Sequence, residues 1–321
     1  MKRDVTIDIA KGIGIITVVW AHLTVACPIK EEIYWFHMPL FFLLSGYFHH
    51  QKNNDVSTFL KKKFKAYIIP YIFFFLLAEI CFITIYTALG LSDKIFISPS
   101  IIIRPYGVLT PLWFFISIFW VSIIYFLICK YSKKESWIHI LSIALALIGY
   151  TLYKFKIHIP LYIDSSISMV LFYHIGKSLN THSFLNKSTS NTLWIMFASI
   201  VSLAIAAILN SRVDIMINQL GNNLFVYIMA ALAGSLFTLI ISRYLTYVPY
   251  ISNIMAYLGR NTLRIFALHM LCFEVGRHLL GFPLLEESTY MDGIYMTIFA
   301  IASSLLIAIP LKRIVPFVYN R

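Results

Sequence analysis

The sequence predicts an all-α, polytopic integral membrane protein, a bundle of about ten transmembrane helices. Of its 321 residues, 60% are hydrophobic and only 12% are charged, whereas soluble domains carry about 25% charged residues. The apolar residues gather into stretches of membrane-spanning length, and the polar connections between them are short. We therefore expect a single membrane domain over residues 1–321, with no additional soluble domain.

The predicted spans follow from hydropathy and length. A crossing needs about 20 apolar residues, or fewer where neighbouring helices shield its ends. In lipid only helices and closed barrels satisfy the backbone, and runs this long exclude barrel strands. The ten expected spans are 7–27, 33–48, 66–90, 110–129, 137–153, 166–180, 192–210, 222–242, 254–280 and 290–311.

The charge pattern predicts the orientation and excludes other classes. Most lysines and arginines of the connections fall on the side of the N-terminus, as the positive-inside rule requires of cytoplasmic loops. Both termini are therefore predicted to be cytoplasmic, and the net charge of +12 indicates topology rather than a nucleic-acid partner. The four cysteines show no CxxC or Cys/His ligand spacing, so neither a disulfide framework nor a metal site is expected.

The first predicted span carries ionisable residues where lipid disfavours them. Asp8, Lys11 and His22 lie among glycine and aliphatic residues, and buried ionisable groups usually face a partner, a cavity or a substrate path. Lys11 and His22 are eleven residues apart, about three turns, so they share one helical stripe about 16 Å long. Asp8, one turn before Lys11, is placed to pair with it. A buried ion pair plus a core histidine would be the structural explanation; a polar path into the bilayer is the functional one.

The second span repeats this theme. His37 is followed closely by Pro39, which removes a backbone hydrogen bond, and Ser45 and Gly46 end the same segment. Because irregular helices at membrane depth commonly line cavities, His37 and His22 are predicted to converge on one.

Two further polar groups stand out. The basic run Lys61–Lys65 precedes the third span; it is explained either by attraction to anionic headgroups or by contacts to the phosphates of an anionic cofactor. Asn261, Arg264 and His269 lie within the ninth predicted span, where they either join helices or line a site.

The chain resembles membrane-bound acyltransferase family 3, and within it the fucose 4-O-acetylase-like branch of sugar O-acetyltransferases. The motifs that carry the resemblance are Asp8–Ile15 leading to His22, Phe36–Tyr47, Lys62–Lys65 leading to Pro70 and Tyr71, Pro111–Phe115, and Leu258–Thr262 leading to His269. Many members of the family have arginine eleven residues before the first-span histidine, where this chain has Lys11.

The resemblance implies an O-acyltransferase in the cytoplasmic (inner) membrane of a bacterium. The donor is then cytoplasmic acyl-CoA, most simply acetyl-CoA, and no metal is needed. The acceptor is a glycan or lipid-linked sugar, as in O-antigen, capsule or exopolysaccharide, so polysaccharide biosynthesis enzymes are expected partners.

The resemblance also suggests roles for individual residues. A histidine has a pKa near working pH, so His22 is expected to act as general base or as transient acyl acceptor. His37 would stabilise the oxyanion or position the acceptor, and Asp8 and Lys11 would orient the donor. Lys11, Lys62 and Lys65 are the expected contacts to CoA. The residues expected to line the site are Ser45, Trp113, Asn261, Arg264 and His269.

Two other function classes remain open from the residues alone. A transporter or flippase for a lipid-linked sugar or small solute would also explain buried charges, although not a basic entrance of cofactor size. A non-catalytic membrane scaffold would leave the polar stripe of the first span unexplained.

Overall fold

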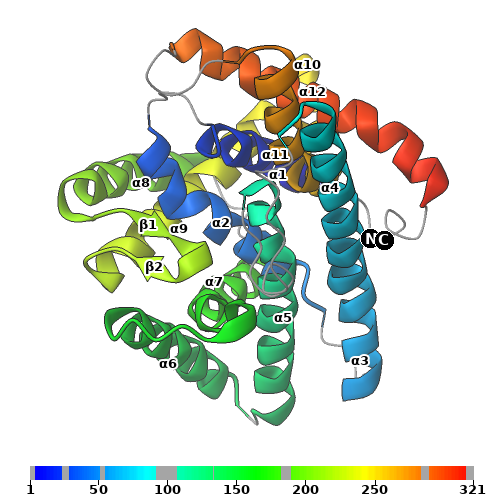
Figure 1. The fold of residues 1–321 in the computed structure, drawn as a ribbon. Coiled ribbons are helices and arrows are strands. Elements are labelled where there is room, and N and C mark those ends of the chain that lie inside the picture. The colour runs from blue at the N-terminus through cyan, green and yellow to red at the C-terminus, as the bar shows by residue number, and fades with distance from the viewer. Residues whose placement is uncertain are drawn as a thin grey trace.

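The computed structural model describes residues 4–23, 29–50, 55–91, 107–132, 134–181, 189–282 and 289–315. The chain is almost entirely helical (Figure 1). The helices are α1 (Val5–Ala21), α2 (Lys30–Tyr47), α3 (Val56–Lys63), α4 (Ile69–Ala88), α5 (Trp113–Tyr131), α6 (Glu135–Lys154), α7 (Ile163–Thr181), α8 (Thr189–Leu209), α9 (Leu224–Leu245), α10 (Pro249–Arg260), α11 (Thr262–Leu279) and α12 (Tyr290–Ile314).

Short elements join some of these helices. A π turn, η1 (Phe64–Ile68), makes α3 and α4 continuous, and 3₁₀ turns cover Gly107–Leu112, Pro160–Tyr162 and Ile215–Ile217. Within the described residues, the departure from an all-α fold is one small antiparallel hairpin, β1 (Val213–Asp214) and β2 (Gln219–Leu220), between α8 and α9.

Local sequence explains several helix starts. The Asp4 side chain caps α1 by accepting from the Thr6 N–H at 2.9 Å, and Asn223 caps α9 in the same way. Helix α12 begins with a reciprocal capping box between Thr289 and Asp292. Such caps satisfy backbone donors that have no partner within the helix.

Each of the ten predicted spans overlaps a helix, and six helical stretches of the described residues are long and apolar enough to cross a membrane. These are Val56–Ala88, Leu109–Tyr131, Glu135–Lys154, Thr192–Leu209, Leu224–Leu245 and Tyr290–Ile314. Ten crossings therefore remain a prediction, and both chain ends, predicted to be cytoplasmic, lie outside the described residues.

The ninth predicted span, 254–280, is not one helix. It divides at Asn261 into α10 and α11. The Asn261 side chain donates to the Tyr257 carbonyl at 2.9 Å, and Thr262 Oγ1 donates to the Gly259 carbonyl at 2.8 Å. Polar side chains that bond to backbone carbonyls compete with the hydrogen bonds of the helix. A hydropathy pattern alone does not reveal this competition. In contrast, α2 runs on through Pro39, so the predicted irregularity does not interrupt it.

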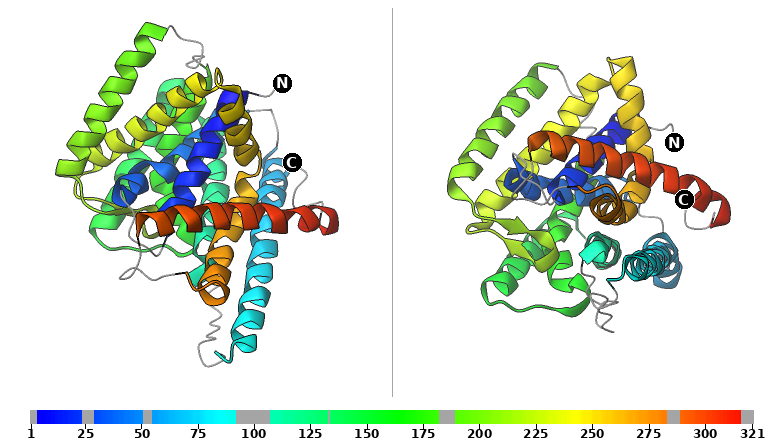
Figure 2. Two further views of the ribbon diagram at one scale, coloured as in Figure 1. Left: turned by 90° about the horizontal axis from the view of Figure 1, so that it is seen from above. Right: turned by 45° about the horizontal axis from the view of Figure 1, so that its top comes forward.

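The two N-terminal helices form the centre of the bundle. Helix α1 packs against α2, α9, α10, α11 and α12, and α2 packs against α7 and α9. Figure 1 shows α8 and α9 on one side of them and α3 and α4 on the other. In Figure 2, α12 runs across α4 and not along it. The polar residues of α1 and α2 therefore face protein on most sides.

The contact between α1 and α10 is a close backbone approach. A Cβ atom on Gly12 would collide with the Met255 carbonyl, and one on Gly259 would collide with the Asp8 carbonyl. The two helices meet at these glycines, as the small residues of the first span predict.

Candidate active site

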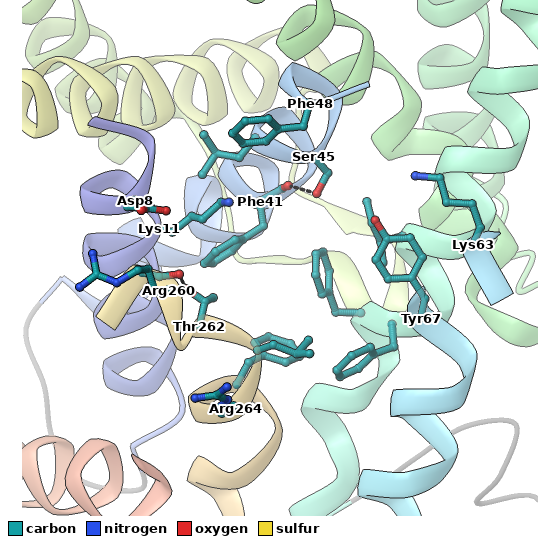
Figure 3. A pocket seen from close by; sticks show the side chains of 17 residues that line it. Asp8, Lys11, Phe41, Ser45, Phe48, Lys63, Tyr67, Arg260, Thr262 and Arg264 are labelled. Carbon is teal, nitrogen blue, oxygen red and sulfur yellow. Dashed lines mark hydrogen bonds between the residues drawn. The ribbon is translucent and has the colours of Figure 1, made fainter. Parts of the chain in front are cut away.

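A cavity of about 520 Å³ lies where α1, α2, η1, α5 and the α10–α11 break meet (Figure 3). Its charged lining comprises Asp8, Lys11, Lys63, Arg260 and Arg264, with Ser45, Tyr67 and Thr262 as further polar groups. The apolar lining comprises Phe41, Leu44, Phe48, Phe114, Phe115, Ile118, Leu263 and Phe266. Four cations and one carboxylate favour an anionic ligand that also has an apolar part.

Helix α1 carries two of the charged groups one turn apart. Asp8 is buried, with a relative exposure of 6%. The ammonium of Lys11 lies 4.8 Å from the centre of the Phe48 ring, within the range of a cation–π contact. Figure 3 shows Asp8 and Lys11 beside each other at the edge of the cavity. The structure therefore brings together the two residues that were predicted to hold the donor.

The α10–α11 break supplies two arginines. Arg264 donates a hydrogen bond to the side-chain oxygen of Asn261, and Asn261 itself is buried. Arg260 is the last residue of α10 and lies next to Gly259, which contacts α1. The break thus places both guanidinium groups at the cavity. Arg260 was not among the residues predicted to line the site, although it lies within the quoted Leu258–Thr262 motif.

Of the lysines in the basic run Lys61–Lys65, Lys63 is the one that lines the cavity. Lys62 and Lys65 are exposed, and the cavity lining includes Lys63 instead. Lys63 is one turn after Phe59, which is buried and stacks on Phe126 with ring centroids 3.9 Å apart. Since residues four apart share a helix face, Lys63 is turned toward the protein. The roles expected for Lys62 and Lys65 therefore remain predictions.

Three histidines and a tyrosine form a second polar group, here called the histidine cluster: His22, His37, His269 and Tyr34. The rings of His22 and His269 have centroids 5.1 Å apart. Tyr34 lies 6.4 Å from His22 and 5.1 Å from His37. His22 and His37 thus both lie next to Tyr34, and His269 joins from α11. Neither His22 nor His37 lines the cavity, so their predicted convergence on a cavity remains a prediction.

Each histidine of the cluster bonds through Nδ1 to a backbone carbonyl of its own helix. His22 contacts the Val18 oxygen at 2.8 Å, His37 the Ile33 oxygen at 2.7 Å, and His269 the Phe266 oxygen at 2.9 Å. A carbonyl only accepts, so Nδ1 must carry the proton.

In a neutral imidazole Nε2 is then the acceptor. This is the tautomer that a general base at Nε2 requires. His22 is a partly buried residue, whereas His269 is fully buried and its Nε2 has no hydrogen-bond partner among the described residues.

An aromatic layer, formed by Phe41, Phe114 and Phe266, separates the cavity from the histidine cluster. Phe114 lies 6.2 Å from Phe41 and 5.4 Å from Phe266, measured between ring centroids. All three line the cavity, and none of the histidines does. The Phe266 ring is also 6.3 Å from that of His269. The Phe266 ring therefore lies between the cavity and His269.

The remaining predicted site residues divide into two groups. Ser45 lines the cavity and donates to the Phe41 carbonyl at 2.8 Å, so it supports the aromatic layer. Trp113 is buried against Tyr162 and Phe42 and does not line the cavity. Among the described residues, no group of three or more histidine, cysteine or acidic side chains is arranged to hold a metal ion.

Comparison with known families identifies the chain. The profile of an acyltransferase domain, acyltransferase family 3, matches residues 4–313. The chain belongs to acyltransferase family 3. No curated protein matches it.

Membership of this family shows that the protein is an acyltransferase. The match covers every element from α1 to α12, and the long apolar helices agree with a multi-pass membrane protein. The acyltransferase assignment predicted from the sequence is therefore confirmed. The sugar O-acetyltransferase branch, the donor and the acceptor remain predictions.

Proposed function

We propose that this acyltransferase is an integral membrane O-acetyltransferase of the bacterial inner membrane. It moves the acetyl group from cytoplasmic acetyl-CoA to a hydroxyl of a cell-surface glycan or a lipid-linked sugar. The observation that carries the proposal is the arrangement described above: a basic cavity whose lining ring Phe266 contacts His269, which in turn contacts the imidazole of His22.

The cavity suits an acyl-CoA donor. CoA combines phosphates with a long, uncharged arm that ends in the thioester. Lys11, Lys63, Arg260 and Arg264 supply the cations for phosphate oxygens, and the aromatic layer gives the thioester end an apolar surface. Since acetyl-CoA does not cross lipid, a cavity that enters the bundle allows the acetyl group to reach a buried site.

His22 is the group best placed to act as base. Its Nδ1–H is committed to the Val18 carbonyl, so Nε2 accepts the proton of the sugar hydroxyl as that oxygen attacks the thioester carbonyl. The C–O bond forms, the C–S bond breaks, and the Nε2 proton passes to the leaving sulfur. In the alternative route, Nε2 attacks the thioester carbonyl, the C–S bond breaks and CoA leaves as the thiolate. The sugar oxygen then attacks the acetyl carbonyl, the bond from Nε2 to the acetyl group breaks, and the hydroxyl proton passes to the thiolate.

His22 also lies at the end of the site away from the cations. It is the residue that ends α1, and it is partly exposed, whereas Asp8 and Lys11 lie at the other end of the same helix. The proposal therefore has the donor enter from the end of Lys11 and the acceptor reach His22 from the opposite side. His37, buried and joined to His22 through Tyr34, would position the acceptor or stabilise the oxyanion.

Two measurements test the proposal. Purified protein in detergent should bind acetyl-CoA by calorimetry, and a strain lacking the gene should lose acetyl esters from a surface glycan by NMR. Complementation with the intact gene should restore the esters, and His22→Ala should not. A protein that binds no acetyl-CoA and leaves glycan esters unchanged, but moves a lipid-linked sugar across reconstituted vesicles, would establish the transporter instead.

A further inference from the structure

A second hollow, of about 650 Å³, lies between the α10–α11 break and the C-terminal part of α12. Four cationic residues line it: Arg260, Arg264, Lys312 and Arg313. No acidic residue of the described chain is among its lining. Like charges that share one hollow repel one another, so a bound anion would lower the energy of the arrangement.

The position of Lys312 and Arg313 alone has a simple explanation, because cations at a helix C-terminus interact favourably with the helix dipole. Arg260 and Arg264 do not share this explanation. They come from a different part of the chain and face the same hollow. The dipole of α12 therefore does not explain why the arginine pair and the Lys312–Arg313 pair line the same hollow.

The floor of the hollow is ordered by hydrogen bonds. Asn261 lines it, is 6% exposed, and donates to the Tyr257 carbonyl. The same Asn261 side chain accepts from Arg264, so the guanidinium is held in one orientation. A fixed guanidinium is suited to paired hydrogen bonds with phosphate oxygens.

Arg260 and Arg264 line both cavities. The two spaces therefore have these arginines in common as part of their walls. The first cavity has the aromatic end that an uncharged arm requires. Half of the residues that line the second hollow are cations, and the others are Tyr257, Asn261, Ala308 and Ile309.

We propose that the second hollow binds the 3′-phosphate of the nucleotide end of acyl-CoA, with Lys312 and Arg313 as contacts from α12. The inference rests on the proposed function and adds a donor subsite to it. Recognition of this phosphomonoester separates CoA from otherwise similar thioesters. It also gives α12, the last helix of the chain, a part in donor binding.

Dephospho-CoA, which lacks only the 3′-phosphate, is the probe. In the variant Lys312→Gln/Arg313→Gln, the dissociation constant for CoA should rise about five- to tenfold, as expected for partly exposed charge-assisted bonds. The dissociation constant for dephospho-CoA should stay within twofold of the wild-type value. Lys130→Gln/Lys134→Gln, which removes the same charge from exposed lysines elsewhere, is the matched control and should bind both probes as the wild type does.

The outcomes separate this inference from the proposed function. Equal losses for both probes, or no loss for either, in a protein that still turns over acetyl-CoA would overturn the subsite and leave the enzyme intact. An effect of the variant that appears only in nanodiscs with anionic lipid, and not with CoA, would assign the hollow to a lipid headgroup and overturn the subsite too. Failure of the wild-type protein to bind CoA at all would instead refute the proposed function.

Discussion

The imidazole rings of His22 and His269 meet edge to face, with centroids 5.1 Å apart and planes inclined by 70°. His22 ends α1 and His269 lies in the middle of α11, so residues far apart in the chain build one imidazole pair. In both, Nδ1 bonds to a backbone carbonyl, and Nε2 is the acceptor nitrogen. His269 is fully buried, while His22 is the more exposed residue of the two.

Replacing His22 with alanine should lower the rate of acetyl transfer by about 10²- to 10⁴-fold, the usual contribution of a general base. Acetyl-CoA binding should be retained, because His22 does not line the donor cavity. Transfer is measured by release of free thiol and binding by calorimetry. Full activity of a normally expressed His22→Ala protein would remove His22 from the mechanism.

Lys11→Met should weaken acetyl-CoA binding by about tenfold or more, since a hydrogen bond to a charged group contributes about 1.5–3 kcal/mol. Lys11→Arg keeps the charge and should restore part of the affinity. The KM for acetyl-CoA reports the change, and kcat at saturating donor should move far less. A loss confined to kcat, with KM unchanged, would contradict a donor-holding role.

The aromatic layer should limit access to the imidazoles. In Phe266→Leu, a smaller side chain stands between the cavity and His269, so acetyl-CoA hydrolysis in the absence of acceptor should increase several-fold. Leucine is preferred to alanine because removing a buried phenyl ring completely costs about 3–5 kcal/mol of stability.

Tyr71→Phe, a buried change outside the cavity lining, is the control for the hydrolysis experiment and should leave the hydrolysis rate unaltered. Hydrolysis that stays at the wild-type rate in Phe266→Leu would show that the layer does not shield the thioester.

Gly12→Val should destabilise the protein, because any Cβ at this position collides with the Met255 carbonyl of α10. Overpacking typically costs about 1–3 kcal/mol, and a backbone atom yields less easily than a side chain. Ile13→Val, a smaller change at the partly buried neighbour, is the control. The midpoint of thermal unfolding in detergent checks the comparison, and an unchanged midpoint for Gly12→Val would show that the two helices separate without cost.

The helices were predictable from the sequence because long apolar runs in lipid leave few alternatives. The break at Asn261 was not, because it depends on side-chain hydrogen bonds to the Tyr257 and Gly259 carbonyls that a hydropathy pattern does not report.

The site was predictable in part. Asp8, Lys11, His22 and His37 stand out as charged or polar groups in apolar segments, and each lies at the cavity or in the histidine cluster. Phe266 and Phe114 could not be identified from the sequence as residues that line the cavity. A phenylalanine in an apolar helix looks the same in the sequence whether it faces lipid or a ligand. The choice of Lys63 over its neighbours depends on which face of α3 carries Phe59, which tertiary packing decides.

The carbonyl groups of Met255 and Asp8 each lie against a glycine of the opposite helix. The backbones of α1 and α10 are therefore in direct contact at these two points. A displacement of Arg260 by an arriving anion must therefore be shared with α1, whose far end carries His22. In the proposed mechanism, a shift of the arginine that binds the donor is thus transmitted through α10 and α1 to His22.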